Sequence, residues 1–386
     1  MKTDKNSLLA AACVLVASLS ACESIIGIED RELADAKTLQ RQNATPQCLQ
    51  YCEEVISSCT GKFQVYSGME TCLGVCALLE AGDSIEPAGN TVACRLDQAR
   101  KAVTTGELNV YCESAGPGGG KACGTNCASY CSLLAKTCPE QAAGVVDCPA
   151  KCLALRDATA TDDSLGFDAT KNHDTDTLQC RLVHVSSATV NAEGHCPHAT
   201  ITPTPPCVDD PLTTPPACAD YCQIVTVACT GADAVYESVS QCLQTCTKLT
   251  VGQLDHKTEN TVGCRKYHAY NSLLDPKTHC SHAGPTGDGH CGKDTDASFA
   301  NCESYCQLAA GACPTEFGQK YADAAACLSE CFGMPATFNA KKDSGYTTAS
   351  AASGNTLQCR VLHTTRVLAD KSAALCPAVF GGAPCN

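Results

Sequence analysis

Histidine and cysteine are closely spaced in the segment TVGCRKYHAYNSLLDPKTHCSHAG, residues 261–284. Cys264 and His268 are four residues apart, so on a helix they share one face. Two further histidines, His279 and His282, follow within the same segment. Neutral imidazole is a common ligand of zinc and copper, so three of them brought together could bind either ion. The segment therefore has the residue types of a metal site.

The same spacing occurs once more in the chain, and two related segments lack it. Cysteine and three histidines recur as Cys180, His184, His195 and His198. In a third segment, the places of the three histidines hold Gln98, Tyr111 and Ser114. In a fourth they hold His363, Leu375 and Ala378. Because a metal is not needed in every copy, the pattern favours histidines with a structural role beside a disulfide, and no cofactor is expected. The alternatives are a metal ion bound by His184, His195, His198, His268, His279 and His282, haem handling, or pH sensing. Covalent haem attachment is disfavoured because C-x2-C-H does not occur.

The cysteines form a regular pattern along the chain. Of 34 cysteines, 32 remain when Cys13 and Cys22 at the N-terminus are set aside. They fall into four sets of eight that open C-x3-C-x6-C and contain a second C-x3-C. These are 48, 52, 59, 72, 76, 94, 112, 123; 127, 131, 138, 148, 152, 180, 196, 207; 218, 222, 229, 242, 246, 264, 280, 291; and 302, 306, 313, 327, 331, 359, 376, 385. An even number in each set predicts complete disulfide pairing in an oxidising compartment.

Disulfides would compensate for small hydrophobic cores. The chain has no Trp and only 7 Phe among 386 residues, and aromatic side chains usually supply much of the buried area. Each natural disulfide contributes roughly 2–4 kcal/mol. The stretch between the fifth and sixth cysteines is 17, 27, 17 and 27 residues long, which suggests duplication of a two-repeat segment.

The spacing within each set predicts helices. Cys48, Cys52, Val55 and Cys59 recur at i, i+4, i+7 and i+11, which is one face of a helix. The second C-x3-C indicates another helix. A third should begin at an Asn or Asp N-cap, at positions 90, 176, 260 and 355. An arginine follows the sixth cysteine each time, and we expect it to satisfy a carbonyl or carboxylate within its own repeat: Arg95, Arg181, Arg265 and Arg360.

Two antiparallel helices with paired C-x3-C motifs can be joined by two disulfides. The first cysteine would then pair with the fifth and the second with the fourth, as Cys48–Cys76 and Cys52–Cys72 in the first repeat. This arrangement resembles the twin C-x3-C hairpins of small mitochondrial intermembrane-space chaperones over about 30 residues per repeat. For the remaining cysteines we expect the third to pair with the sixth (Cys59–Cys94) and the seventh with the eighth (Cys112–Cys123), one choice among the roughly 105 connectivities that eight cysteines allow.

The fold class that follows is mainly α, with little or no β: tandem small disulfide-rich repeats, each a stapled helical hairpin plus a third helix. Turn-rich stretches at 116–124, 201–218 and 283–296 mark the boundaries. The expected organisation is a signal peptide (1–21), a lipid anchor and tether (22–47), and repeats at 48–123, 124–207, 208–291 and 292–386.

The N-terminus predicts export. Lys2 and Lys5 precede an apolar run too short to span a bilayer, as in a signal peptide. The run ends in Leu-Ser-Ala-Cys, which resembles the lipobox of bacterial lipoproteins. The resemblance implies lipidation of Cys22, and Glu23 after it implies sorting to the outer membrane, on its periplasmic or surface face.

Composition and motifs narrow the function. The net charge of −14 argues against nucleic acid as a partner. No G-x-S-x-G or H-E-x-x-H occurs, so an enzyme is not expected. With its lipobox and four eight-cysteine repeats, the chain resembles uncharacterised cysteine-rich repeat lipoproteins of Gram-negative bacteria, including myxobacterial types.

Three functional hypotheses follow. The first is a lipid-anchored envelope protein whose rigid modules are structural or bind envelope proteins or an extracellular ligand. The second is a metal- or haem-handling envelope protein that uses the histidines. The third is an envelope thiol–disulfide protein.

Overall fold

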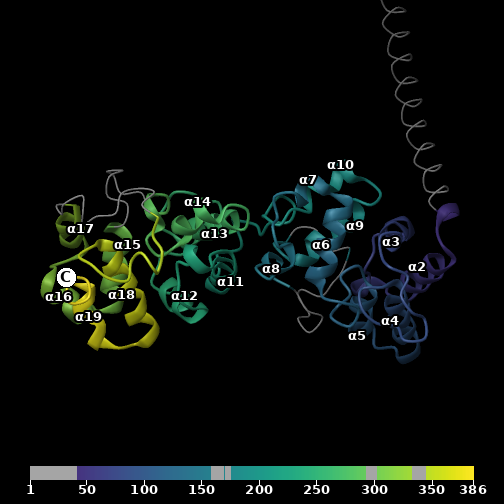
Figure 1. The fold of residues 1–386 in the computed structure, drawn as a ribbon, viewed down its shortest axis with the longest axis horizontal. Helices are drawn as coiled ribbons and strands as arrows, with labels where there is room; N and C mark the ends of the chain where they lie inside the picture. Colours follow the sequence, from purple (N-terminus) through teal and green to yellow (C-terminus); the bar gives the residue numbers. More distant parts are fainter. Residues whose placement is uncertain (1–40, 158–168, 170–174, 293–301, 333–344) are drawn as a thin grey trace, which may run out of the picture.

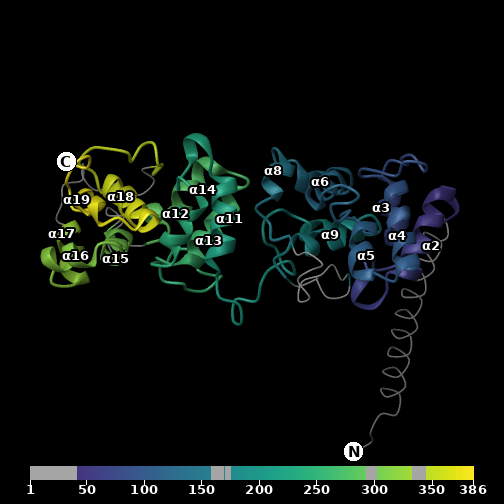
Figure 2. The ribbon, with the colours of Figure 1, turned by 90° about the horizontal axis from the view of Figure 1, so that it is seen from below.

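The computed structural model describes residues 41–157, 169, 175–292, 302–332 and 345–386. Within these ranges the chain is helical, with isolated β-bridges and no β-strand. The helices form four groups that follow one another in chain order along the long axis, and both views show this order (Figures 1 and 2). We call the groups units one to four. No helix in the described part of the chain is long and apolar enough to cross a membrane.

Each unit contains one set of eight cysteines. Unit one has α2 (Pro46–Ser58), α3 (Met69–Cys76), α4 (Val92–Thr105) and α5 (Leu108–Ala115). Unit two has α6 (Asn126–Thr137), α7 (Pro139–Ala142), α8 (Cys148–Cys152), α9 (Leu178–Ser187) and α10 (Ala192–His195). Unit three has α11 (Cys218–Ala228), α12 (Val239–Cys246), α13 (Val262–Ser272) and α14 (Pro276–Ala283). Unit four has α15 (Cys302–Ala312), α16 (Pro314–Lys320), α17 (Ala324–Phe332), α18 (Leu357–Asp370) and α19 (Cys376–Val379).

Two disulfides join the first two cysteine-bearing helices of each unit. In unit one α2 and α3 are linked by Cys48–Cys76 and Cys52–Cys72, as the sequence predicts. The other units form the same two bonds between their corresponding cysteines.

The expected pairing of the other four cysteines is wrong. The structure has Cys59–Cys112 and Cys94–Cys123, and the same third-to-seventh and sixth-to-eighth pattern in every unit. The reason lies in the direction of α4. Gln47, at the start of α2, and the N–H of Ala93, at the start of α4, both donate to the carbonyl of Ala81. Further along the two helices Arg100 contacts Glu54, so α2 and α4 run side by side in the same direction. Cys94, in the first turn of α4, is far from the end of α2 that carries Cys59.

The N-cap of the helix that carries the sixth cysteine (α4, α9, α13 and α18) is also different from the expected one. The capping side chain is the threonine one residue later: Thr91, Thr177, Thr261 and Thr356 each accept a hydrogen bond from the backbone N–H of the sixth cysteine. The Asn or Asp before it is engaged elsewhere, because the arginine that follows the cysteine donates to it.

Units one and three resemble each other, as do units two and four. A buried tyrosine pair occurs in the former, with Tyr51 and Tyr66 hydroxyls 2.8 Å apart and Tyr221 and Tyr236 hydroxyls 3.0 Å apart. Units two and four instead have a short helix that starts with proline directly after the third cysteine, α7 and α16. The alternation in the lengths between cysteines therefore has a structural counterpart.

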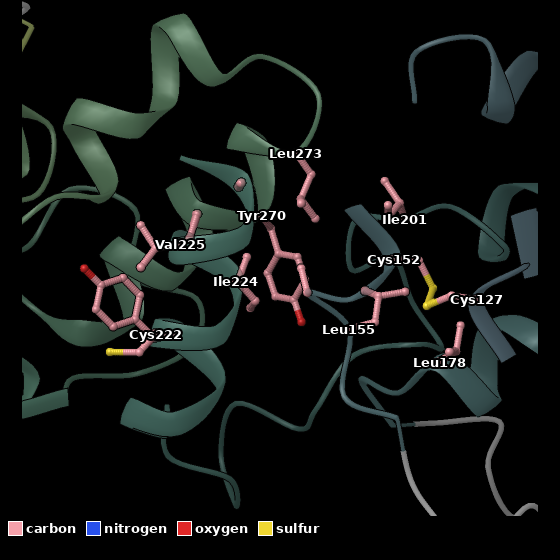
Figure 3. Packing of buried hydrophobic residues seen from close by; sticks show 14 of the residues in the cluster. Cys127, Cys152, Leu155, Leu178, Ile201, Cys222, Ile224, Val225, Tyr270 and Leu273 are labelled. Atoms are coloured by element: carbon pink, nitrogen blue, oxygen red, sulfur yellow. A yellow bond between two sulfur atoms is a disulfide. The ribbon is translucent and has the colours of Figure 1, made fainter. Parts of the chain in front are cut away.

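The hydrophobic core continues from unit to unit. Buried half-cystines, tyrosines and small aliphatic residues of all four units belong to one cluster. Figure 3 shows part of it at the boundary of units two and three, where Leu155 and Ile201 lie together with Ile224, Tyr270 and Leu273. The units are therefore packed against one another through apolar side chains.

Candidate functional site

The histidines of unit three converge on one point. His268 lies on α13, and His279 and His282 lie on α14, which packs directly against α13. The Asp275 side chain accepts from the N–H of Thr278 and so starts α14 soon after α13 ends. The Nδ1 atoms of His268 and His279 are 3.1 Å apart, and one ring nitrogen from each of the three histidines lies within 4.8 Å of the others.

Two of the three histidines in this cluster are buried. His268 and His282 are 6% and 4% exposed, whereas His279 is partly exposed. Burial, together with the nearby His282 and His279, lowers the pKa of His268 to about 3. Burial also lowers the pKa of His279, although Asp275 opposes the shift. Both imidazoles are therefore neutral near pH 7, the form that ligates metals.

A fourth histidine joins the cluster, and the sequence did not point to it. His290 follows η4 (Gly287–Gly289), and its ring stacks on that of His282 with centroids 3.7 Å apart. Its place, directly before the eighth cysteine, holds Ala122, Pro206 and Pro384 in the other units. A comparison of the four units at this position would have singled it out.

Unit two repeats part of this geometry. The Nδ1 atoms of His184 and His195 are also 3.1 Å apart, and the ring of His198 lies 5.1 Å from that of His184. The two histidine sets predicted from sequence are therefore both brought together by the fold.

Sulfur lies close to these histidines but cannot ligate. Sγ atoms of Cys264 and Cys291 lie within 4.8 Å of a His268 nitrogen, and the matching atoms surround His184 and His363. In each case the two cysteines form a disulfide, so they offer no thiolate. Ligation would rest on imidazole.

The four arginines lie inside the protein. Arg95, Arg181 and Arg265 are fully buried and Arg360 is 8% exposed. Arg265 donates to the carbonyls of Thr261, Gly284 and Pro285 and to the side chain of Asn260. These partners lie in the arginine's own unit, as expected.

One contact of this arginine crosses into the next unit, which the sequence did not predict. Arg265 Nη2 donates to Ser304 Oγ of unit four over 2.9 Å, and Ser304 Oγ in turn lies 3.0 Å from Asn260 Oδ1. Arg95, Ser129 and Asn90 form the same triangle between units one and two. The arginine therefore closes the junction between neighbouring units with an asparagine and a serine. We call this type of junction neutral because both partners of the arginine are uncharged, in contrast to the aspartate at the junction of units two and three.

The junction of units two and three is charged instead. Asp176 replaces the asparagine, and its Oδ1 accepts from Arg181. Lys266 Nζ, nearly buried, lies 3.6–3.8 Å from carboxylate oxygens of Asp176, Asp209 and Asp220. Burial alone would raise the pKa of Asp176, but Arg181 and Lys266 outweigh it and hold the pKa below its usual value.

A cavity of about 280 Å³ lies beside this junction. Asp176, Asp209, Lys266 and Tyr270 are part of its wall, so it borders the same charged groups. The Tyr270 hydroxyl donates to Asp176 Oδ2 over 2.5 Å. The side chains of the two units are thus linked directly next to an open space.

The predicted signal peptide and the predicted lipidation site Cys22 lie outside the described residues. The matching of the chain to known families nevertheless extends into that region. A family model, the BfoA family C-terminal domain, matches residues 16–126 and again residues 211–297. No solved structure matches the chain.

Each of the two matches spans one complete eight-cysteine set, that of unit one and that of unit three. These are the two units that share the tyrosine pair. The matches cover 111 and 87 residues, together 198 of the chain's 386 residues and so just over half of it. The chain belongs to the BfoA C-terminal domain family.

Proposed function

We propose that this protein is a lipid-anchored scaffold of the bacterial cell envelope, whose four units form a stiff rod that has a structural role or presents a binding surface. The observation that carries the proposal is the closure of all three unit junctions by buried polar side chains. The lipid on Cys22 and the signal peptide before it would place the rod at the outer membrane.

The oxidation state supports an extracytoplasmic location. All 32 cysteines from residue 48 onward form disulfides within their own unit, sixteen bonds in total. Such bonds form and persist in oxidising compartments. A thiol–disulfide exchange role is less well supported, because a reactive cysteine needs access and a thiolate, whereas most of these sulfurs are buried and bonded.

The charged junction supports stiffness. Lys266 is taken out of water, and its three carboxylate partners come from unit two, the inter-unit connection and unit three. Swinging the units apart would separate Lys266 from Asp176 and leave each with a partner in its own unit only, Asp220 for Lys266 and Arg181 for Asp176. The cost is then part of the about 3–5 kcal/mol that a buried charge left with no partner would incur. The joint should therefore stay closed most of the time.

The neutral junctions act in the same sense. Between units three and four, Gln241 donates to Thr365 and Arg366 pairs with Glu237, in addition to the triangle around Arg265. Several hydrogen bonds in parallel restrain rotation more than one does. A rod built in this way needs no catalytic step.

The anchor and the rod can be tested separately. The wild-type chain, expressed with its signal peptide, should fractionate with membranes and incorporate labelled fatty acid, and Cys22→Ala should release it into the soluble periplasmic fraction. Small-angle X-ray scattering of the released protein should then match the elongated arrangement of Figure 1.

Lys266→Met with Asp176→Asn should broaden the distribution of lengths in the same scattering experiment. The matched control is Lys277→Met, which removes an exposed lysine of the same unit. A compact or widely variable wild-type particle would refute the rod, and membrane retention of Cys22→Ala would refute the anchor.

A further inference from the structure

We propose that His268, His279 and His282 of unit three bind one late first-row transition-metal ion of the zinc and copper class. This site goes beyond the scaffold role, and neither role requires the other. The sequence favoured structural histidines because two units lack them. The convergence of three ring nitrogens is what the structure adds.

The spacing of the nitrogens fits an ion. Two imidazole nitrogens bound to a tetrahedral zinc at about 2.0–2.1 Å are about 3.3 Å apart. His268 Nδ1 and His279 Nδ1 are 3.1 Å apart. The His282 nitrogen lies within 4.8 Å of both, so a rotation of its side chain completes a three-sided face. Three histidines leave a fourth position for solvent or another ligand.

The surrounding covalent structure holds the ligands in place. Cys280, between His279 and His282, is bonded to Cys229 of α11, and Cys264, one turn before His268, is bonded to Cys291. Both elements that carry the histidines are therefore fixed by disulfides. Ligands whose positions are locked by their surroundings bind metal more tightly than mobile ones.

A metal ion can also reach the cluster. His268 and His282 form its buried side, and His279 and His290 are partly exposed and form its outer side. The ring of His290 stacks on that of His282, so His290 borders the cluster on this outer side. An entry path and a second imidazole shell are both features of protein metal sites.

The competing explanation for the short distance between the nitrogens is a hydrogen bond between two imidazoles. A single N–H between two neutral imidazoles gives the same 3.1 Å separation, and this is sufficient for the pair His184 and His195 in unit two. A hydrogen-bonded pair does not need a third nitrogen facing it. The histidine pair of unit two, with the same Nδ1–Nδ1 distance, is therefore the comparison for the three histidines of unit three.

The experiment uses the full oxidised chain, stripped of metal with a chelator and checked for absence of free thiols by alkylation. Zinc and copper(II) salts are titrated separately, with calorimetry for affinity, native mass spectrometry for stoichiometry and, for copper, electron paramagnetic resonance for nitrogen ligands. We expect one tight equivalent with nitrogen hyperfine structure.

The variants assign the site. His279→Gln and His282→Asn should each weaken binding by at least about tenfold, and hydrogen exchange will show whether unit three stays folded. His256→Gln is the matched control, because His256 Nδ1 contacts Thr261 outside the cluster. His195→Gln in unit two should leave the tight equivalent unchanged.

Two results would overturn the proposal. One is a chain that retains no stoichiometric metal, which would leave a hydrogen-bonded histidine pair only. The other is binding that survives His279→Gln and His282→Asn or disappears with His195→Gln. Neither result would affect the scaffold role, which is tested by scattering.

Discussion

Removing the Cys59–Cys112 disulfide should destabilise unit one more than removing Cys52–Cys72. Cys59 and Cys112 are 53 residues apart, and closing a loop of that length removes about 4 kcal/mol of chain entropy from the unfolded state. Cys52–Cys72 is nested inside Cys48–Cys76. The two separations are 20 and 28 residues, so with the outer bond intact the inner one closes a loop of only eight residues. That loop corresponds to about 2.5 kcal/mol.

Hydrogen–deuterium exchange with mass spectrometry measures this difference within the intact chain. The double variants Cys59→Ala/Cys112→Ala and Cys52→Ala/Cys72→Ala are compared through peptides of unit one, and peptides of unit four serve as the internal control. The opening constant should rise about 1,000-fold for the first variant and about 70-fold for the second. Equal effects, or the reverse order, would refute the reasoning.

The same variants test the connectivity. From residue 48 onward, Cys59→Ala/Cys112→Ala should contain no cysteine that alkylates, because Cys94 and Cys123 remain bonded to each other. Peptide mapping of the wild-type chain without reduction should recover the Cys59–Cys112 link. Recovery of Cys59–Cys94 instead would contradict the structure.

Three further predictions concern single residues. Arg265→Met should destabilise unit three by about 3 kcal/mol or more, because several buried acceptors lose their donor. Arg360→Met should cost less, since the bond from Arg360 to Asn355 is 3.3 Å long and the matching bond from Arg265 to Asn260 is 2.8 Å long; equal losses in thermal unfolding would contradict this. The depressed pKa of Asp176 means that its stabilising contribution is present above the ordinary aspartate range, about pH 4, and is lost as pH falls through the lower folded pKa. In Asp176→Asn the stability of the unit two–three region should therefore depend less steeply on pH in the acid range. An unchanged acid-unfolding profile would contradict a stabilising role of the ionised Asp176. Gly263→Ala should disrupt α13, because a Cβ there would lie 1.8 Å from a backbone carbonyl, whereas Gly318→Ala, with no atom within 4 Å, should be neutral or stabilising in melting experiments.

The helical hairpin could be predicted because its information is local. C-x3-C places two sulfurs on one helix face, and two such helices can meet in only a few ways. The partner of Cys59 depended on whether α4 runs with α2 or against it. That direction is a matter of tertiary structure, in which both helices start beside Ala81, and cysteine spacing does not encode it.

In the candidate site, too, local features could be predicted and tertiary ones could not. The spacing placed His268 on the face of Cys264, but the approach of His279 depends on how α14 folds back on α13. His290 was missed because its contribution comes from a turn after α14. The arginines were expected to be internal, and their role at the unit junctions depends on Ser129 and Ser304, two residues without any distinctive sequence signal.

The alternation of neutral and charged junctions restricts how a chain of this kind can change its length. Removing units two and three together would bring Asn90 and Arg95 against Ser304, which restores the neutral set of partners. Removing unit two alone would put Asn90 in the place of Asp176, so that nearly buried Lys266 would lose this carboxylate. Insertions and deletions in such arrays should therefore be tolerated in steps of two units, and we expect natural variants of different length to contain even numbers of them.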